Sequence, residues 1–209
     1  MNIPSIPLHA STQMDNRSAD KVKFLSDVGF PRVVLARELS LQQISEIHKA
    51  NPDTELEVFV HGALCVSYSG QCYASQHCFA RSANRGACAQ FCRLSFDMVD
   101  AGGEVIAKGK HLLSLKDMNR SGDVEQMLDA GVTSFKIEGR LKDISYVKNI
   151  TAYYRKKLDE VFARRPEYVR ASYGSCSPQF TPSPEKSFSR GFTDYMLHGS
   201  KDGMTSFES

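Results

Sequence analysis

A regular alternation of strand-like and helix-like segments constrains the fold of this chain more than any other feature. Apolar and β-branched runs lie at residues 6–10, 33–36 and 56–60, and they start roughly 25 residues apart, which is the repeat of a βαβ unit. Helix-like segments lie between them, over 16–27 and 40–48, and the second begins with Ser and Gln at capping-box spacing. Because parallel strands need such crossover helices, we predict an α/β fold with a parallel sheet, open or closed as a barrel.

The second half of the chain departs from this rhythm. A cysteine-bearing segment follows His61-Gly62 and runs to Arg93, and Ser, Pro and Gly dominate beyond Arg165, where we place a linker. A complete (β/α)8 barrel takes about 250 residues, so we predict either a small α/β domain or a barrel that lacks some of its strands. The remaining predicted elements are a hairpin over 94–106, a strand at 112–115, a helix over 122–130, a strand at 133–137 and a long helix capped by Asp143.

Composition excludes several classes of protein. Apolar residues make up 41% of the chain and charged residues 24%, with a net charge of +2, which excludes collagen-like and wholly disordered chains. No apolar run approaches the roughly 18 residues that a membrane-spanning helix needs. The first residues lack the basic and apolar regions of a signal peptide. We therefore expect a cytoplasmic, reducing location and no membrane partner.

Cysteine usage points to a metal site. Five of the six cysteines lie between residues 65 and 92, and in a reducing compartment such density indicates a metal rather than disulfides. The pattern C-x6-C-x15-C-x3-C supplies four thiolates, enough for a 4Fe–4S cluster or a structural zinc, and the wide first spacing favours the cluster. The plain alternative is four reduced cysteines that pack as small apolar side chains. The proposed ligands are Cys65, Cys72, Cys88 and Cys92, whereas Cys78 and Cys176 fall outside the pattern.

Several strings of this sequence resemble one family. Residues 57–65, followed by 69–72 and Ser75, resemble the signature of the collagenase-like peptidases, family thirty-two of the peptidases of unknown mechanism (U). The strings at 7–14, 34–39, 81–93 and 136–140 resemble other segments of that family, and 190–193 resembles the start of its following domain. The resemblance thus covers most of the chain from residue 7 to 161.

The resemblance implies the C-terminal part of a (β/α)8 TIM-like barrel with a cysteine-rich insertion, followed by the start of a second domain. Residues 1–165 would form the partial barrel, with the strands at 6–10, 33–36, 56–60 and 133–137 as its last four. Residues 166–209 would form a Pro/Ser-rich linker and the beginning of a truncated β-rich domain. On this interpretation the chain is a fragment truncated at both ends, and we expect its exposed sheet edges to favour self-association.

The resemblance also implies a function. Relatives include factors that hydroxylate ribosomal or transfer RNA and depend on iron–sulfur chemistry and on prephenate metabolism, so we expect an iron–sulfur-dependent RNA hydroxylation enzyme with prephenate as a co-substrate. The alternatives are a collagenase-like protease and a metal-pinned module without catalysis. The sequence contains neither H-E-x-x-H nor G-x-S-x-G. A Cys65–His61 nucleophile is conceivable, but a thiol that binds a cluster cannot also attack a peptide.

Other candidate site residues follow the predicted strands, where the active face of a barrel lies. Arg37 and Arg140 suit a dicarboxylate. An equal alternative is that Arg37–Glu38 and Glu138–Arg140 belong to a structural ion-pair ring around the barrel mouth. His61 adjoins the cysteine segment and is either a hydrogen-bond donor or a packed core residue. The predicted catalytic residues are His61, Glu138 and Arg37, and the predicted substrate contacts are Gln13, Arg37, Lys116 and Arg140.

Basic residues also surround the cysteines. Arg81 and Arg85, interleaved with Phe79 and Phe91, predict a platform for an unpaired RNA base. Charge compensation of an anionic cluster is an equal alternative, which would also employ Arg93. The basic runs at 155–157 and 164–165 indicate a solvated helix face.

Overall fold

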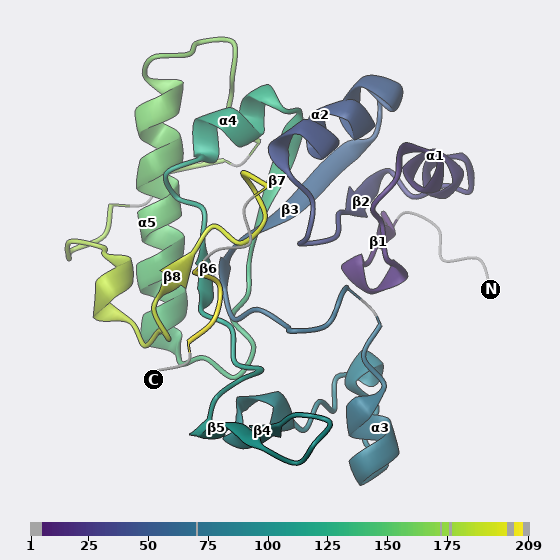
Figure 1. Cartoon of the computed structure of the whole chain (residues 1–209). Helices are drawn as coiled ribbons and strands as arrows, with labels where there is room; N and C mark the ends of the chain where they lie inside the picture. The colour runs from purple at the N-terminus through teal and green to yellow at the C-terminus, as the bar shows by residue number, and fades with distance from the viewer. Residues whose placement is uncertain (1–5, 70, 172, 176, 200–202, 207–209) are drawn as a thin grey trace.

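The computed structural model describes residues 6–69, 71–171, 173–175, 177–199 and 203–206, and Figure 1 shows its elements. The helices are α1 (Ala19–Asp27), α2 (Leu41–Ala50), α3 (Ala74–Phe79), α4 (Val124–Asp129) and α5 (Ile144–Phe162), with 3₁₀ turns η1 (Thr12–Met14), η2 (Ala83–Arg85), η3 (Phe91–Arg93) and η4 (Pro184–Lys186). The strands are β1 (His9–Ala10), β2 (Arg32–Val34), β3 (Glu55–Gly62), β4 (Phe96–Val99), β5 (Val105–Lys110), β6 (Asp117–Asn119), β7 (Val132–Ile137) and β8 (Phe192–Thr193).

A mixed sheet built around β3 organises the molecule. β1, β2, β3 and β7 are parallel and neighbour one another in chain order. At Leu56 the strand pairs with β2 and β7 on opposite edges, and at His61 β6 has replaced β2 as the antiparallel neighbour. β8 continues the sheet parallel to β6. The prediction of an α/β fold with a parallel sheet is confirmed, and the described strands do not close into a barrel.

Four helices cover one face of this sheet. Leu56, Val58 and Val60 of β3 pack in one core cluster with buried side chains from α1, α2, α4 and α5. Along this layer α1 contacts α2, α2 contacts α4, and α4 contacts α5, as Figure 1 shows. The alternation of side chains along β3 sends Phe59 to the other face, where it packs with Val34 in a second cluster.

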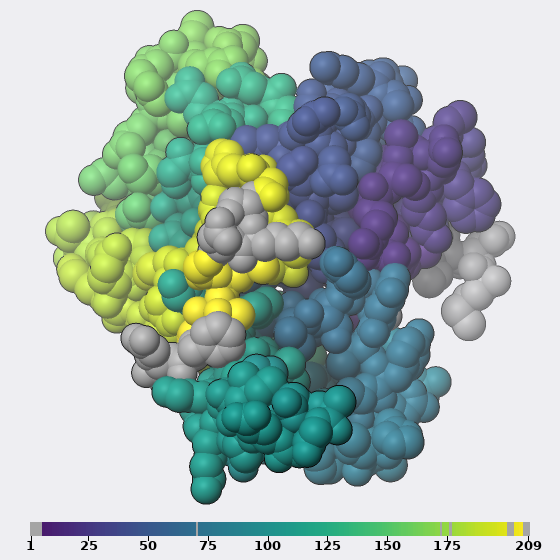
Figure 2. All heavy atoms as spheres, in the orientation of Figure 1, coloured from purple at the N-terminus to yellow at the C-terminus, as the bar shows by residue number. Residues whose placement is uncertain are grey.

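The C-terminal segment covers part of that second face. Tyr195 is buried with Phe59, Leu64, Leu115 and Met118. Below the sheet, the cysteine-bearing segment and the β4–β5 hairpin form a separate lobe, drawn from blue to teal in Figure 2. Among the described residues, no helix has both the length and the apolar character to cross a bilayer.

Helix starts follow the predicted capping residues. Ser40 accepts a hydrogen bond from the Gln43 amide and the Gln43 side chain bonds back to the Ser40 amide, so the capping box is confirmed. Asp143 accepts a hydrogen bond from the Tyr146 amide at 2.7 Å and caps α5 as predicted. α1 begins later than predicted, because the buried Asn16 donates its side-chain amide to the Val34 carbonyl at 2.9 Å instead of joining the helix.

The strand predicted at 112–115 is wrong. Residues 112 and 113 form a turn, Leu115 makes an isolated bridge to Thr205, and the sheet instead takes up β6. Tertiary pairing decides this outcome, because β6 is held by hydrogen bonds to the end of β3 rather than by its own strand propensity. The predicted hairpin is confirmed as β4 and β5, which are antiparallel.

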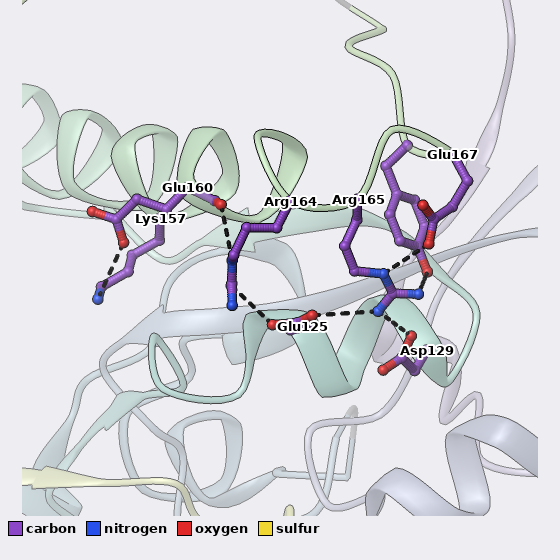
Figure 3. Close-up of polar contacts among 8 residues, drawn as sticks. Glu125, Asp129, Lys157, Glu160, Arg164, Arg165 and Glu167 are labelled. Atoms are coloured by element: carbon purple, nitrogen blue, oxygen red, sulfur yellow. Dashed lines mark hydrogen bonds and ion pairs between the residues drawn. The ribbon is translucent and has the colours of Figure 1, made fainter.

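Ion pairs join the end of α5 to α4 (Figure 3). The Arg165 guanidinium lies 2.6 Å from Asp129 and 2.8 Å from Glu167, and Arg164 lies 3.0 Å from Glu125. The basic pair at 164–165 is therefore not simply a solvated face, because both guanidiniums meet carboxylates, three of the four contacts being with α4.

Candidate functional site

The carboxyl ends of β2, β3 and β7 bring the first group of candidate residues together. The Glu138 amide, just after β7, donates a hydrogen bond to the His61 carbonyl at 2.8 Å. Gly62 makes this approach possible: it has φ +107°, and a Cβ placed there would lie 2.4 Å from the Glu138 carbonyl oxygen. Only glycine fits such a contact without displacing the backbone.

Arg37 and Glu138 form an ion pair across this end of the sheet. The guanidinium Nη2 lies 3.8 Å from Glu138 Oε2, with both side chains mostly buried, and its carbon lies 4.1 Å from the centre of the Phe59 ring. The other Glu138 oxygen accepts the Arg140 amide at 2.8 Å. Glu38 turns instead to the Ser69 amide, which donates to it at 2.8 Å. Of the four residues assigned to an ion-pair ring, Arg37 and Glu138 thus pair with each other across the strand ends.

Arg120, which the sequence analysis did not identify, supports Arg37 from below. It is 1% exposed, and it donates to the carbonyls of Arg37 at 2.9 Å, Phe59 at 3.2 Å and Asp194 at 3.1 Å. Burial lowers the pKa of Arg120 to about 10. No sequence signal separates this arginine from an exposed one, because its partners are backbone carbonyls from distant segments.

His61 is packed rather than open to a substrate. The residue is 2% exposed, and rings of Tyr146, Tyr154 and Phe192 lie within about 6 Å of its own. Burial, and next the positive charge of Lys142, lower the pKa of His61 to about 4. The imidazole is therefore neutral near pH 7, which agrees with the alternative of a packed core residue.

The four pattern cysteines gather in the lobe below the strand ends. Desolvation raises the pKa of Cys92, and the charges of Cys65, Cys88 and Cys72 raise it further. Burial likewise raises the pKa of Cys65, the charges of Cys72 and Cys88 add to this rise, and the nearby Arg37 offsets part of it. Cys78 is exposed on α3 and does not belong to this set. Cys176 lies outside the described residues.

Backbone amides are directed at two of these sulfurs. The Gln90 amide donates to the Cys88 sulfur at 3.4 Å, and the Ser67 amide donates to the Cys65 sulfur. In both cases the donor lies two residues after the cysteine. Such hydrogen bonds stabilise thiolates that bind metals, so the donor set fits a soft, sulfur-ligated centre. Within the described ranges, no three His, Cys, Asp or Glu side chains stand in a metal-binding arrangement.

Arg93 attaches this lobe to the sheet. Its guanidinium donates to the carbonyl of Leu64, to the carbonyl of Leu115 at 2.9 Å and to the Ser114 hydroxyl at 3.1 Å. Arg93 is thus occupied by the protein itself. Phe91 in η3 packs near Phe79 of α3, with ring centres 6.1 Å apart.

Of the other predicted substrate contacts, some border the cysteine lobe and others lie elsewhere. Arg81 and Arg85 are exposed, and Arg81 donates to the Cys88 carbonyl at 3.4 Å. The Arg140 guanidinium lies against Gly86, so it borders the cysteine lobe. Lys116 instead runs along Gly191. Gln13 is exposed in η1, and in the part of the chain that the structure describes its side chain has no polar contact with these residues.

A family model described as peptidase family U32 matches residues 1–206, and the chain belongs to this family. It is 54% identical to the 23S rRNA 5-hydroxycytidine C2501 synthase of Escherichia coli over 100% of this chain and 32% of that protein. It is 36% identical to the tRNA hydroxylation protein P of Helicobacter pylori, over 93% of this chain and 46% of that protein.

A third relative has a different name. A collagenase of Porphyromonas gingivalis is 35% identical over 95% of this chain and 49% of that protein. The chain thus spans between about a third and a half of the length of these relatives. No solved structure matches the chain.

Proposed function

We propose that this chain is the cluster-bearing part of an iron–sulfur-dependent enzyme that hydroxylates RNA in the cytoplasm, with a cytidine of 23S ribosomal RNA as the substrate. The observation that carries the proposal is 54% identity, over the whole chain, to a 23S rRNA 5-hydroxycytidine synthase. Transfer RNA is the second substrate class, because a tRNA hydroxylation protein of Bacillus subtilis is 39% identical over 79% of this chain.

We further infer that the sheet belongs to a (β/α)8 TIM-like barrel, with residues 1–165 as its C-terminal part and 166–209 as a linker and the start of a β-rich domain. Two features support this inference. β1, β2, β3 and β7 are parallel in chain order, and α1, α2, α4 and α5 all pack on one face. A doubly wound sheet would carry helices on both faces.

The four gathered thiols are the proposed ligands of a 4Fe–4S cluster, with zinc as the alternative metal. A bound cluster supplies electron transfer. Cys65, Cys72, Cys88 and Cys92 would hold it, and the Ser67 and Gln90 amides, by donating to sulfur, would raise its reduction potential. The positive charge of Arg37 beside Cys65 offsets the negative charge of four thiolates.

The remaining residues are proposed to bind and orient the substrate. Glu138 fixes Arg37 by the ion pair and is the proposed proton acceptor, since a quarter of its side chain is exposed. His61, neutral and buried, positions the end of β3. The groups proposed to contact RNA phosphates or a dicarboxylate co-substrate such as prephenate are Arg81, Arg85, Arg140, Gln13 and Lys116.

Complementation tests the proposal. The gene for this protein is expressed in a bacterial strain whose own 23S rRNA 5-hydroxycytidine synthase has been deleted. Hydroxycytidine in the purified rRNA is then measured by mass spectrometry. We expect the wild type to restore the modification and Cys88→Ser to lower it at least tenfold. Cys78→Ser is the matched control, because this cysteine is exposed in the same lobe yet outside the gathered set.

Other outcomes would replace the proposal. Hydroxylation that persists in Cys88→Ser would show that the reaction does not depend on the proposed ligand Cys88. Cleavage of collagen peptides by the purified protein, retained in Cys88→Ser, would favour the peptidase that the P. gingivalis relative's name suggests. A folded protein that contains metal but modifies no RNA would favour a metal-pinned module without catalysis.

A further inference from the structure

A cavity of about 470 Å³ lies between the first turns of α5 and the segment 180–188 that carries η4. The two walls are side by side in Figure 1. Three lysines line the cavity, namely Lys142, Lys148 and Lys186, together with three aromatic rings, those of Tyr146, Phe180 and Phe188. None of the residues predicted from the sequence as a site residue lines it.

The charge of this cavity is positive and not neutralised. Among the described side chains, no carboxylate forms an ion pair with Lys142, Lys148 or Lys186. The one acidic lining residue, Asp143, accepts a hydrogen bond from the Tyr146 amide as the helix cap. Three lysines and one carboxylate therefore line the cavity, and this excess of positive charge attracts an anion.

Two exposed aromatic rings lie beside these charges. Phe188 is 67% exposed and Phe180 is 45% exposed. The Lys142 ammonium lies 5.0 Å from the centre of the Phe188 ring and 4.9 Å from that of Tyr146, and the Arg190 guanidinium carbon lies 5.2 Å from the centre of the Phe188 ring. Lys142 also donates to the Phe188 carbonyl at 3.4 Å, but no described carboxylate neutralises it. An exposed ring next to such cations is the pairing of groups by which proteins bind single-stranded nucleic acid, with the base on the ring and the phosphate on the cations.

The cavity wall is held in place by the protein. Asn149, buried in α5, donates to the Ser183 carbonyl at 2.7 Å and to the Ser187 hydroxyl at 2.8 Å, and it accepts the Ser183 amide at 2.9 Å. Lys186 donates to the Thr181 carbonyl at 2.9 Å. These hydrogen bonds fix the segment that lines the cavity opposite α5.

The cavity lies at the same end of β7 as the cysteine lobe. One loop, residues 138–143, follows β7 and leads into α5. Its Arg140 lies against Gly86 of the lobe, and its Lys142 and Asp143 line the cavity. This loop therefore borders both the cysteine lobe and the cavity.

We propose that this cavity binds a single-stranded nucleotide of the RNA substrate that flanks the modified base. Its base stacks on Phe188 and its phosphate is bound by Lys142 and Lys148. The proposal rests on RNA as the substrate of the proposed function and adds a site at which that RNA is anchored. An acidic peptide, which would also suit the lysines, has no use for the exposed ring and is an outcome of the test.

Fluorescence anisotropy with a labelled ten-uridine RNA tests the proposal on the natural-length protein. We expect Phe188→Ala to weaken binding about tenfold. Lys148→Ala should weaken binding at low salt and reduce the slope of log affinity against log salt by about 0.7. Lys156→Ala is the matched control, because it is an exposed lysine on the same helix that does not line the cavity, and circular dichroism checks the fold of each variant.

Unchanged RNA affinity in both Phe188→Ala and Lys148→Ala would overturn the proposal. Tighter binding of labelled polyglutamate than of RNA, lost in Lys148→Ala but kept in Phe188→Ala, would also overturn it and indicate an acidic peptide. The two proposals fail separately. If the wild-type protein binds RNA through this cavity but restores no hydroxycytidine, the proposed reaction is wrong and the cavity assignment stands. If Cys88→Ser abolishes the modification while the cavity variants bind RNA normally, only the cavity assignment is wrong.

Discussion

Gly62 ends β3 at the point where the backbone of Glu138 passes closest to it. We predict that Gly62→Ala lowers the free energy of unfolding by about 3 kcal/mol more than Gly29→Ala. The two glycines have similar φ, +107° and +102°, but an added Cβ meets nothing within 4 Å at Gly29 and lies 2.4 Å from the Glu138 carbonyl oxygen at Gly62. Urea unfolding measures both, and equal losses would show that the close approach is absent.

Because the pKa of His61 is lowered, we predict a loss of stability in acid. The unfolded chain takes up a proton on this imidazole near pH 6.5, whereas the folded protein takes it up only at about pH 4. Between these values the unfolded state binds more protons, so stability falls as pH falls, by about 3 kcal/mol in total. His61→Gln cannot titrate there. Urea unfolding from pH 7 to pH 4 should show a flatter decline for this variant, and parallel curves would contradict the prediction.

The sequence predicted which residue types lie at the strand ends, but not how they pair. Arg37, His61 and Glu138 were all expected there, because they follow β-branched runs. The pairing depends on how strands that are distant in sequence lie next to each other. Arg37 therefore forms its ion pair with Glu138, just after β7, and not with Glu38. Arg120 was missed for the same reason, since its partners are carbonyls of residues distant in sequence.

At the scale of elements, the cap of α5 should contribute measurably to stability. Asp143 has extended backbone and accepts the Tyr146 amide, as an N-cap does. We predict that Asp143→Ala lowers the free energy of unfolding by about 1 kcal/mol, and that Asp143→Asn, which keeps a cap acceptor, loses only a small part of this. Thermal unfolding compares the two variants. An equal loss in both would assign the effect to charge rather than to the cap.

Helices were easier to predict than strands for a physical reason. Capping and apolar periodicity are local signals, and Ser40 and Asp143 begin helices where both occur. β6 is short and polar, and its pairing with the end of β3 places it in the sheet. The apolar run at 112–115 lacked such a partner strand and became a turn and an isolated bridge. The C-terminal barrel half stays a prediction.

At the scale of the whole molecule, the sheet leaves strand edges unpaired. Within the described ranges β1 pairs only with β2, and β7 only with β3. Open edges template pairing with a second chain, so we predict that these 209 residues, expressed alone, self-associate. Light scattering after size exclusion should show a mass that rises with concentration. Thr133→Lys places a charge on an exposed position of β7 and should reduce the association. Because the Thr133 hydroxyl donates to the Leu56 carbonyl of β3 at 3.4 Å, circular dichroism checks that the variant is folded. A monomer at every concentration in the wild type would contradict the prediction.

The attachment of the cysteine lobe by Arg93 has a consequence for how the protein matures. The two described core clusters include Leu64 and Leu115 but no residue between them, and Arg93 joins the carbonyls of these same two leucines. The sheet and its helices thus acquire their packing without any contribution from the thiols. If the proposed centre is an iron–sulfur cluster, we therefore expect iron and sulfide to be inserted into an already folded protein, and a damaged cluster to be rebuilt without replacing the polypeptide.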